Sequence, residues 1–316
     1  MGISSAPNAT IAPPMNILFA SQIEPAERWI PLLERALPKD RFFTESKSAI
    51  DIGLVATPPP GALEKLNGAK LIQSLWMGVE KLLADPALPR NVPLARLIDP
   101  GMVAAMTETV LVHTLDWHRR LYRYRQQQSE ARWHRFRQYM TFDHTVGLLG
   151  LGELGTDAAR KLLALGFKIA GWSRRPKKLD GVESFTDISS VLAKSDVVVC
   201  LLPLTPQTKG ILNLANLQKV KKGGGLINVA RGPHVVVPDL IAALDSGHLA
   251  HAYLDVFDTE PLPADSPLWR HPRVTVTPHA AALTEPRTAV AKIAEQVERV
   301  RRGETPRNLV DFSAGY

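Results

Sequence analysis

The sequence has almost no cysteine, since its 316 residues include only Cys200, and no disulfide can form within the chain. A reducing, cytoplasmic compartment is therefore expected. No stretch approaches the ~18 uninterrupted apolar residues of a membrane span, and no histidine or cysteine spacing indicates a metal site. Residues 1–14 lack the basic and apolar regions of a secretion signal. With 45% hydrophobic and 22% charged residues, the composition predicts a globular protein with no membrane partner.

The formal net charge of +7 is concentrated in one segment, residues 117–140, which we call the basic arm. It contains seven arginines and a single acid, Glu130, and therefore carries +6, which leaves +1 for the rest of the chain. Tyrosine, tryptophan and phenylalanine alternate with these arginines, a pattern that by itself is compatible with binding of single-stranded nucleic acid. A solvated helix face or a contact between subunits is the alternative interpretation.

Alternating strand and helix patterns predict an α/β fold of two domains, one flavodoxin-like and one Rossmann-like, each with a parallel sheet. Strands are expected at residues 16–20, 52–56, 71–75, 145–149, 168–172, 196–202, 226–229, 252–256 and 274–277. Helices are expected at residues 25–37, 62–66, 103–124, 156–165 and 286–302.

Gly150, Gly152 and Gly155 form a G-x-G-x-x-G pattern between a predicted strand and a predicted helix, the context of a dinucleotide-binding turn. The first glycine permits the tight turn, the second lets the backbone approach a pyrophosphate, and the third lets helix and strand pack closely. The amides of Glu153 and Leu154 then lie at the helix N-terminus, where the helix dipole favours an anion.

The type of dinucleotide is predicted from the segment about 20 residues further on, where NAD-binding proteins place an acidic residue for the ribose hydroxyl. Here the strand is followed by Ser173, Arg174 and Arg175, with no carboxylate to repel a phosphate. Serine can donate a hydrogen bond and arginine can form charge-assisted bonds to a 2′-phosphate. The sequence therefore favours NADP(H), with NAD(H) as a possible second cofactor.

Three charged or ionisable residues follow predicted strands in otherwise apolar segments: Arg231, Glu260 and His279. In an open α/β sheet, ligands bind at the carboxyl ends of the strands, so these side chains are expected to converge.

The motifs that contain these residues resemble those of the D-isomer-specific 2-hydroxyacid dehydrogenases, and within that family the type that reduces glyoxylate and hydroxypyruvate. The resemblance extends from about residue 16 to the C-terminus. It is carried by the glycine turn, Leu202-Pro-Leu-Thr-Pro-Gln-Thr208, Asn228-Val-Ala-Arg231-Gly, Leu254-Asp-Val-Phe-x-x-Glu260-Pro-Leu and Thr277-Pro-His279.

The resemblance implies reduction of a 2-keto acid to a 2-hydroxy acid by hydride transfer from NADPH. Arg231 would hold the substrate carboxylate and polarise its keto oxygen. His279 would protonate the developing alkoxide, and Glu260 would bond the other ring nitrogen and keep the imidazole protonated to higher pH. Further cofactor contacts are implied for Leu202, Pro203, Thr208, Ala230 and Asp255, the last with the nicotinamide carboxamide.

A loop in the first domain, at Trp76, Met77 and Gly78, corresponds to the family's G-x-G-x-D loop, whose amides bind the substrate carboxylate. Trp76 replaces the first glycine and Glu80 replaces the aspartate. The amides of Met77 and Gly78 can still bind a carboxylate, and Trp76 would narrow the pocket toward a small substrate.

The resemblance also implies domain boundaries and a dimer. Residues 1–99 with 286–316 would form the substrate-binding domain, and residues 100–285 the NAD(P)-binding domain, with the active site in the cleft between them. Relatives dimerise through the segment that corresponds to the basic arm, from which Trp133 would reach the partner's active site. This interpretation makes nucleic acid an unexpected partner.

Other members of the same fold remain as alternatives. Formate dehydrogenases carry glutamine where Glu260 stands and prefer NAD, and phosphoglycerate dehydrogenases carry a regulatory domain, which is not expected after residue 316. Specificity for pyruvate or phenylpyruvate is a closer alternative. A non-catalytic NAD(H)-sensing protein of the corepressor type is a more distant one, because residues 1–98 show no extended apolar groove for a peptide.

Overall fold

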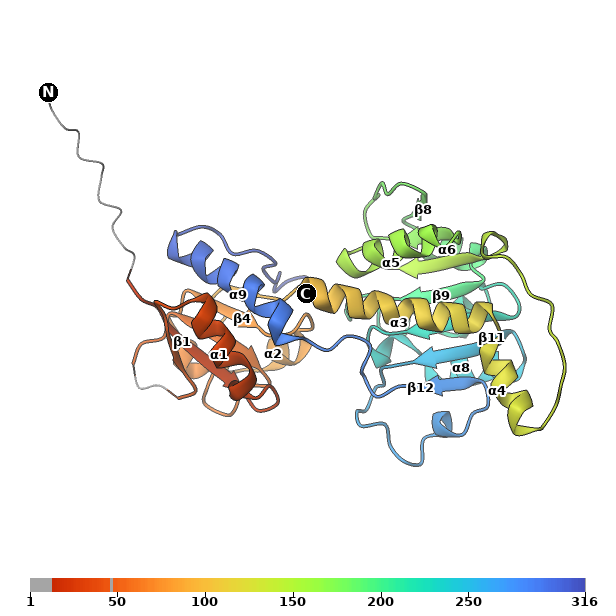
Figure 1. Cartoon of the computed structure of the whole chain (residues 1–316), viewed down its shortest axis with the longest axis horizontal. Coiled ribbons are helices and arrows are strands. Elements are labelled where there is room, and N and C mark those ends of the chain that lie inside the picture. The colour runs from red at the N-terminus through yellow and green to blue at the C-terminus, as the bar shows by residue number, and fades with distance from the viewer. Residues whose placement is uncertain (1–12, 46–47, 316) are drawn as a thin grey trace, which may run out of the picture. The chain divides into compact units, whose positions relative to one another are not determined.

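The computed structural model describes residues 13–45 and 48–315 (Figure 1). The chain divides into two compact units, which are described separately below. Unit 1 comprises the described residues up to Pro100 and those from Thr284 onward, and unit 2 comprises Gly101–Leu283. Within the described ranges, every helix is too short or too polar to cross a membrane.

Unit 1 is built on a parallel sheet, in which the described strands follow the order β2-β1-β3-β4-β5. This is the flavodoxin-like order, in which the topological switch point lies between β1 and β3. Ligands of such sheets bind outside the carboxyl ends of the strands near that point, so the loops after β1 and β3 are placed for binding. The strands are β1 (Asn16–Ser21), β2 (Arg41–Phe43), β3 (Ile52–Ala56), β4 (Leu71–Ser74) and β5 (Leu94–Ala95).

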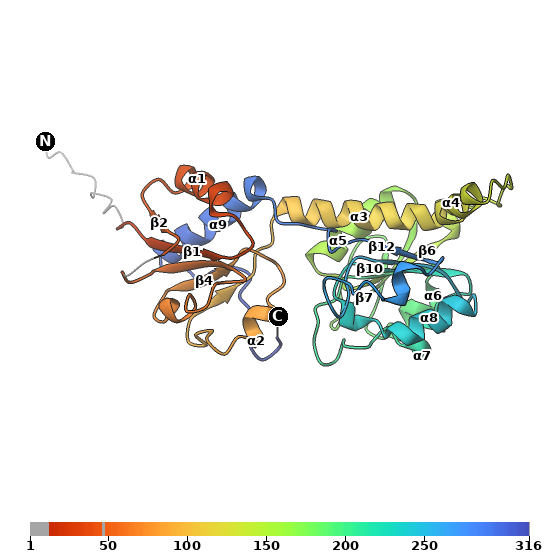
Figure 2. The ribbon, with the colours of Figure 1, turned by 90° about the horizontal axis from the view of Figure 1, so that it is seen from below.

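Helices cover both faces of this sheet (Figure 2). On one face, Trp29 and Leu33 of α1 (Ala26–Ala36) pack with Ile293 of α9 (Pro286–Arg301) against the strands. The other face is covered by the 3₁₀ turn η1 (Glu64–Leu66) and the short helix α2 (Glu80–Ala84). Burial on both faces explains why β3 is a continuous apolar run instead of an alternating one.

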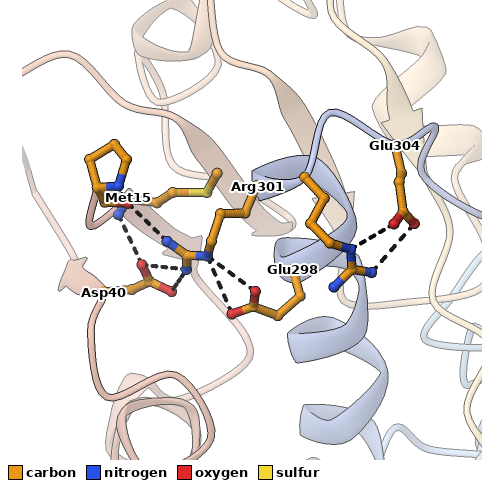
Figure 3. A network of polar contacts seen from close by, with 7 residues as sticks. Met15, Asp40, Glu298, Arg301 and Glu304 are labelled. Atoms are coloured by element: carbon orange, nitrogen blue, oxygen red, sulfur yellow. Dashed lines mark hydrogen bonds and ion pairs between the residues drawn. The ribbon is translucent and has the colours of Figure 1, made fainter. Parts of the chain in front are cut away.

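The C-terminal helix α9 is fixed to the beginning of unit 1 by a buried ion pair (Figure 3). The Nη2 atom of Arg301 donates to both carboxylate oxygens of Asp40, at 2.7 and 2.6 Å. Nη1 donates to the Pro13 carbonyl at 2.9 Å, and Nε lies 3.2 Å from Glu298. Asp40, whose side chain is fully buried, also accepts the Met15 amide. Each charge is thus paired, as burial of charges requires.

Unit 2 contains a parallel sheet whose strands run in the order β12-β11-β10-β9-β6-β7-β8 across its described residues. This is the Rossmann order with one further strand, and its switch point lies between β6 and β9. The strands are β6 (Thr145–Leu149), β7 (Lys168–Trp172), β8 (Val182–Phe185), β9 (Val197–Cys200), β10 (Gly224–Asn228), β11 (Leu249–Leu254) and β12 (Val274–Val276). The α/β class with parallel sheets, as expected from the sequence, is confirmed.

Helices also cover both faces of the second sheet. Val110 of α3 and Leu162 of α5 pack on one face, and Leu192 of α6 and Leu240 of α8 pack on the other. The helices are α3 (Pro100–His118), α4 (Leu121–Ser129), α5 (Glu153–Ala164), α6 (Ile188–Lys194), α7 (Leu214–Leu217) and α8 (Val237–Asp245), with 3₁₀ turns η2 (Thr141–Asp143), η3 (Gly232–His234) and η4 (Pro267–Trp269).

The structure differs from the sequence-based secondary structure at one predicted helix and at several elements that were not predicted. The helix expected at residues 103–124 is two helices, α3 and α4, because Arg120 adopts a left-handed conformation with φ +58°. The break is held by an ion pair across it, in which Arg125 of α4 donates to Asp116 of α3 at 2.6 and 2.9 Å. The short strands β2, β5 and β8 were not predicted, since they have too few residues for a clear apolar pattern. The helices α2, α6, α7 and α8 were not predicted either.

Candidate active site

The glycine turn joins β6 to α5 at the switch point of the second sheet. Gly150 has φ +108°, a conformation that side chains disfavour, and its amide donates to the Trp172 carbonyl at 3.1 Å. A Cβ atom on Gly155 would overlap the Gly150 carbonyl oxygen. By contrast, a Cβ on Gly152 would have no described atom within 4 Å, so the backbone there is open to a ligand. The three glycines thus meet the three requirements of a dinucleotide turn.

Helix α5 begins immediately after this turn, with Gly152 as its N-cap. The amides of Glu153 and Leu154 lie in the first turn, where backbone N–H groups have no partner within the helix. Together with the open backbone at Gly152, these donors fit a pyrophosphate group.

Residues 173–175 follow β7, and Ser173 has two backbone partners there. Its hydroxyl donates to the Arg175 carbonyl at 2.6 Å, and its amide donates to the Phe185 carbonyl at 3.1 Å. Ser173 therefore shapes the loop that presents Arg174 and Arg175. Both arginines are exposed, as a role in binding a phosphate from solvent requires.

Lys177 is a residue of this site that the sequence did not single out. Its Nζ atom donates to the Leu151 carbonyl in the glycine turn and lies 3.2 Å from Oγ1 of Thr156 in the first turn of α5. Lys177 thereby joins the loop after β7 to the glycine turn. In the sequence it is one member of a basic run, and its position there gave no sign of these partners.

The segment from Leu202 to Thr208 follows β9, beside the glycine turn. The Thr208 hydroxyl donates to the Pro203 carbonyl at 2.7 Å and accepts the Thr205 amide at 2.8 Å. Thr208 is buried, so in this structure it stabilises the loop whose backbone would meet a cofactor.

His279 and Glu260 are brought together at the carboxyl ends of neighbouring strands. Glu260 lies beyond β11 and His279 follows β12, and the two strands are parallel neighbours. The Nδ1 atom of His279 lies 2.8 Å from Oε2 of Glu260, while Oε1 of Glu260 accepts the Phe257 amide at 2.9 Å. Both side chains are partly exposed, at 48% and 36%.

The charges around Glu260 keep it ionised. Partial burial raises the pKa of the Glu260 carboxyl, while the hydrogen bonds from His279 and the Phe257 amide lower it. The positive charge of Arg231, which follows β10, lowers it further, so that the pKa lies below its usual value. The Nη1 atom of Arg231 also donates to the Ala230 carbonyl at 2.6 Å. The charges of both His279 and Arg231 thus act on Glu260.

Asp255 is buried beneath His279 and holds its turn. Oδ1 accepts the Thr277 hydroxyl at 2.6 Å and the Ala280 amide at 2.9 Å, and Oδ2 accepts the Ala281 amide at 2.9 Å. The Asp255 carbonyl accepts the His279 amide at 2.8 Å. A carboxylate has about four acceptor positions, of which three are occupied here. Positioning of His279, which the sequence did not indicate, is therefore the role that the contacts of Asp255 support.

The predicted substrate loop lies in unit 1, between β4 and α2. Trp76 is partly buried, and its indole Nε1 donates to Glu24 at 2.9 Å. Its amide donates to the Ser74 hydroxyl, and its carbonyl accepts both that hydroxyl and the Leu97 amide. Met77 and Gly78 follow and are partly exposed.

The basic arm consists of the end of α3, then α4, then an extended segment. Two of its aromatic rings lie under its own arginines: the Arg123 guanidinium lies 3.7 Å from the Phe136 ring centre, and that of Arg120 lies 5.3 Å from the Tyr139 ring centre. Trp133, by contrast, has 91% of its surface exposed.

A glycine turn at the switch point of a Rossmann-order sheet, with arginine, glutamate and histidine beyond neighbouring strands, defines an NAD(P)-dependent dehydrogenase. The comparisons with known proteins agree. The family model described as "D-isomer specific 2-hydroxyacid dehydrogenase, NAD binding domain" matches residues 111–281. The chain belongs to the D-isomer-specific 2-hydroxyacid dehydrogenase family.

Similar proteins match the chain over nearly its whole length. It is 40% identical over 313 residues to glyoxylate/hydroxypyruvate reductase A of Serratia proteamaculans, covering 96% of this chain and 100% of that protein. A D-isomer-specific 2-hydroxyacid dehydrogenase of Xanthobacter autotrophicus, solved with NADPH and MES, is 40% identical with a TM-score of 0.92. An NADPH-dependent glyoxylate/hydroxypyruvate reductase of Sinorhizobium meliloti, solved with NADP and sulfate, is 35% identical with a TM-score of 0.89. Both structures cover 96% of this chain and are covered completely.

Proposed function

We propose that this protein reduces small 2-keto acids, glyoxylate and hydroxypyruvate, to 2-hydroxy acids with NADPH. The observation that carries the proposal is the His279–Glu260 pair. It lies beyond the carboxyl ends of β11 and β12, and Arg231 follows the neighbouring strand β10. The similarity to reductases of this specificity, over the full length of the chain, supports the choice of substrate and cofactor.

The residues present fit the cofactor. The open backbone at Gly152 and the α5 N-terminus suit its pyrophosphate, and the exposed Arg174 and Arg175 suit a 2′-phosphate. When bound, NADPH supplies the hydride.

The chain itself supplies the proton and the binding of the substrate. The Arg231 guanidinium holds the substrate carboxylate and polarises the keto oxygen, a task that its planar set of donors suits. His279 binds Glu260 through Nδ1, which leaves Nε2 as the atom that donates a proton to the oxygen. The ionised Glu260 stabilises the imidazolium form before transfer. In unit 1, the amides of Met77 and Gly78 bind the substrate carboxylate.

To test the proposal, the oxidation of NADPH is monitored by its absorbance with glyoxylate, hydroxypyruvate, pyruvate and phenylpyruvate in parallel. We expect the highest kcat/KM with glyoxylate or hydroxypyruvate. A preference for phenylpyruvate or pyruvate would contradict the substrate assignment. Absence of turnover with all four, combined with tight NAD(H) binding, would contradict catalysis and favour a dinucleotide-sensing protein.

We further propose that the protein is a homodimer joined through the basic arm and located in the cytoplasm. The exposed Trp133 and Met140 of its extended segment supply apolar surface for a second copy. Cys200 is fully buried and burial raises the pKa of its thiol to about 12, which fits a structural thiol in a reducing compartment. Light scattering after gel filtration tests the dimer, and a monomeric mass would contradict it.

A further inference from the structure

Two loops at the carboxyl edge of the unit 1 sheet are joined by one carboxylate. Glu24 lies in the loop after β1, and Trp76 lies in the loop after β4, 52 residues later. Strands β1, β3 and β4 are parallel neighbours, so both loops leave the sheet at the same edge. This edge adjoins the switch point between β1 and β3, where ligands of such sheets bind.

Glu24 accepts hydrogen bonds from two indoles, one on each oxygen. Oε1 accepts from Nε1 of Trp76 at 2.9 Å, and Oε2 accepts from Nε1 of Trp29 at 3.0 Å. Trp29 is fully buried in the core beneath α1. The Glu24 amide donates to the Ser21 hydroxyl at 2.7 Å, which fixes the loop after β1. Trp29 thus fixes the Glu24 carboxylate to the core, and this fixed carboxylate in turn fixes the Trp76 indole.

The arrangement requires a carboxylate, because both partners are donors and each needs an acceptor. A glutamine has one acceptor oxygen, and its NH₂ group would face the second indole N–H. The backbone of Trp76 is held separately by the Ser74 hydroxyl and the Leu97 amide. Loss of the Glu24 charge therefore releases the indole while the course of the loop is retained.

We propose that Glu24 is a positioning residue that fixes the Trp76 indole and so restricts the size of the keto acid that the loop accepts. This inference rests on the proposed function, in which residues 76–78 bind the substrate. In this role Glu24 acts on the substrate through the indole that it holds, and not by a contact of its own. A fixed indole favours a substrate with a small group beside the carbonyl, and a released one admits a larger group.

The kinetic test uses three variants: Glu24→Gln, Trp76→Phe and the double variant that combines these two changes. Glu27→Gln, at an exposed site in the first turn of α1, is the control. We expect Glu24→Gln to raise the KM for glyoxylate about tenfold, the effect of one charge-assisted bond, with kcat within a factor of two. The ratio of kcat/KM for phenylpyruvate over glyoxylate should rise. The double variant should match Trp76→Phe, because the two changes remove one interaction. Glu27→Gln should behave as the wild type.

A second measurement reports on the contact without activity. In ¹⁵N-indole NMR spectra, Glu24→Gln should move the signals of Trp29 and Trp76 upfield and leave the signals of the other indoles in place. The signal that is missing in Trp76→Phe identifies Trp76. Unmoved signals would overturn the double contact. Moved signals with unchanged KM and substrate ratio would overturn the positioning role alone. A wild type without turnover on any keto acid would overturn the proposed function and this role with it, whatever the spectra show.

Discussion

The Nδ1 atom of His279 lies 2.8 Å from Oε2 of Glu260, although the two residues belong to different loops beyond neighbouring strands. The lowered pKa of Glu260 keeps this carboxylate ionised through the neutral range, so it can stabilise a protonated imidazole. Glu260→Gln keeps the shape and removes the charge. The variant removes the charge that faces the imidazole, so kcat/KM for reduction should fall, and the acid limb that protonation of Glu260 gives the wild-type profile below the usual glutamate pKa should be absent. The pH profile of kcat/KM checks this, and an unchanged profile would show that the pair has no catalytic role.

Arg174 and Lys177, both near the glycine turn, should affect the choice between NADPH and NADH differently. Arg174→Ala removes a predicted partner of the 2′-phosphate, so the KM for NADPH should rise about tenfold, and the KM for NADH should stay constant. Lys177→Met instead removes the bonds to the Leu151 carbonyl and Thr156, which support a turn common to both cofactors. Here both KM values should rise together. A wild-type enzyme that prefers NADH would contradict the assignment of Arg174.

The buried pair Asp40–Arg301 should contribute strongly to the stability of unit 1. Arg301→Met leaves a fully buried carboxylate without its main partner, which costs about 3 kcal/mol of unfolding free energy. The double change with Asp40→Asn should recover part of this loss. The neighbouring Arg302, the C-cap residue of α9, pairs with Glu304 in the solvent-exposed region and provides the matched control. Urea unfolding of Arg302→Met should be close to that of the wild type. Equal effects of the two arginines would contradict this account.

Trp133 tests whether the basic arm has more than a structural role. If it reaches the partner's substrate, Trp133→Ala should raise the KM for the keto acid severalfold while the KM for NADPH stays constant. Phe142→Ala, at another exposed aromatic side chain close by, serves as the control. An unchanged KM in a dimer of normal stability would confine the arm to assembly.

The sequence predicted the elements that have strong periodicity and the residues that belong to motifs. The β6–α5 turn could be predicted because three glycines meet a backbone requirement that can be stated in advance. The break at Arg120 could not, because no glycine or proline marks it, and the Asp116–Arg125 pair that holds it forms only in the folded chain.

The supporting residues of the site were also missed. The partners of Lys177 and Glu24 are set by tertiary contacts. A contact of Asp255 with the nicotinamide stays a prediction, and its hydrogen bonds to groups 22–26 residues later in the chain were not foreseen. Such contacts depend on strand order and register, which local patterns do not specify.

The bonds from Asp255 to the turn that carries His279 have a consequence for the reaction cycle. His279 adopts a left-handed backbone conformation, with φ +52°, which a free loop would seldom sample. Because the buried carboxylate imposes it, the entropy of ordering this loop is lost once, when the chain folds. Each turnover then begins with the proposed proton donor already in place, and the binding energy of even a two-carbon substrate need not be spent on arranging it.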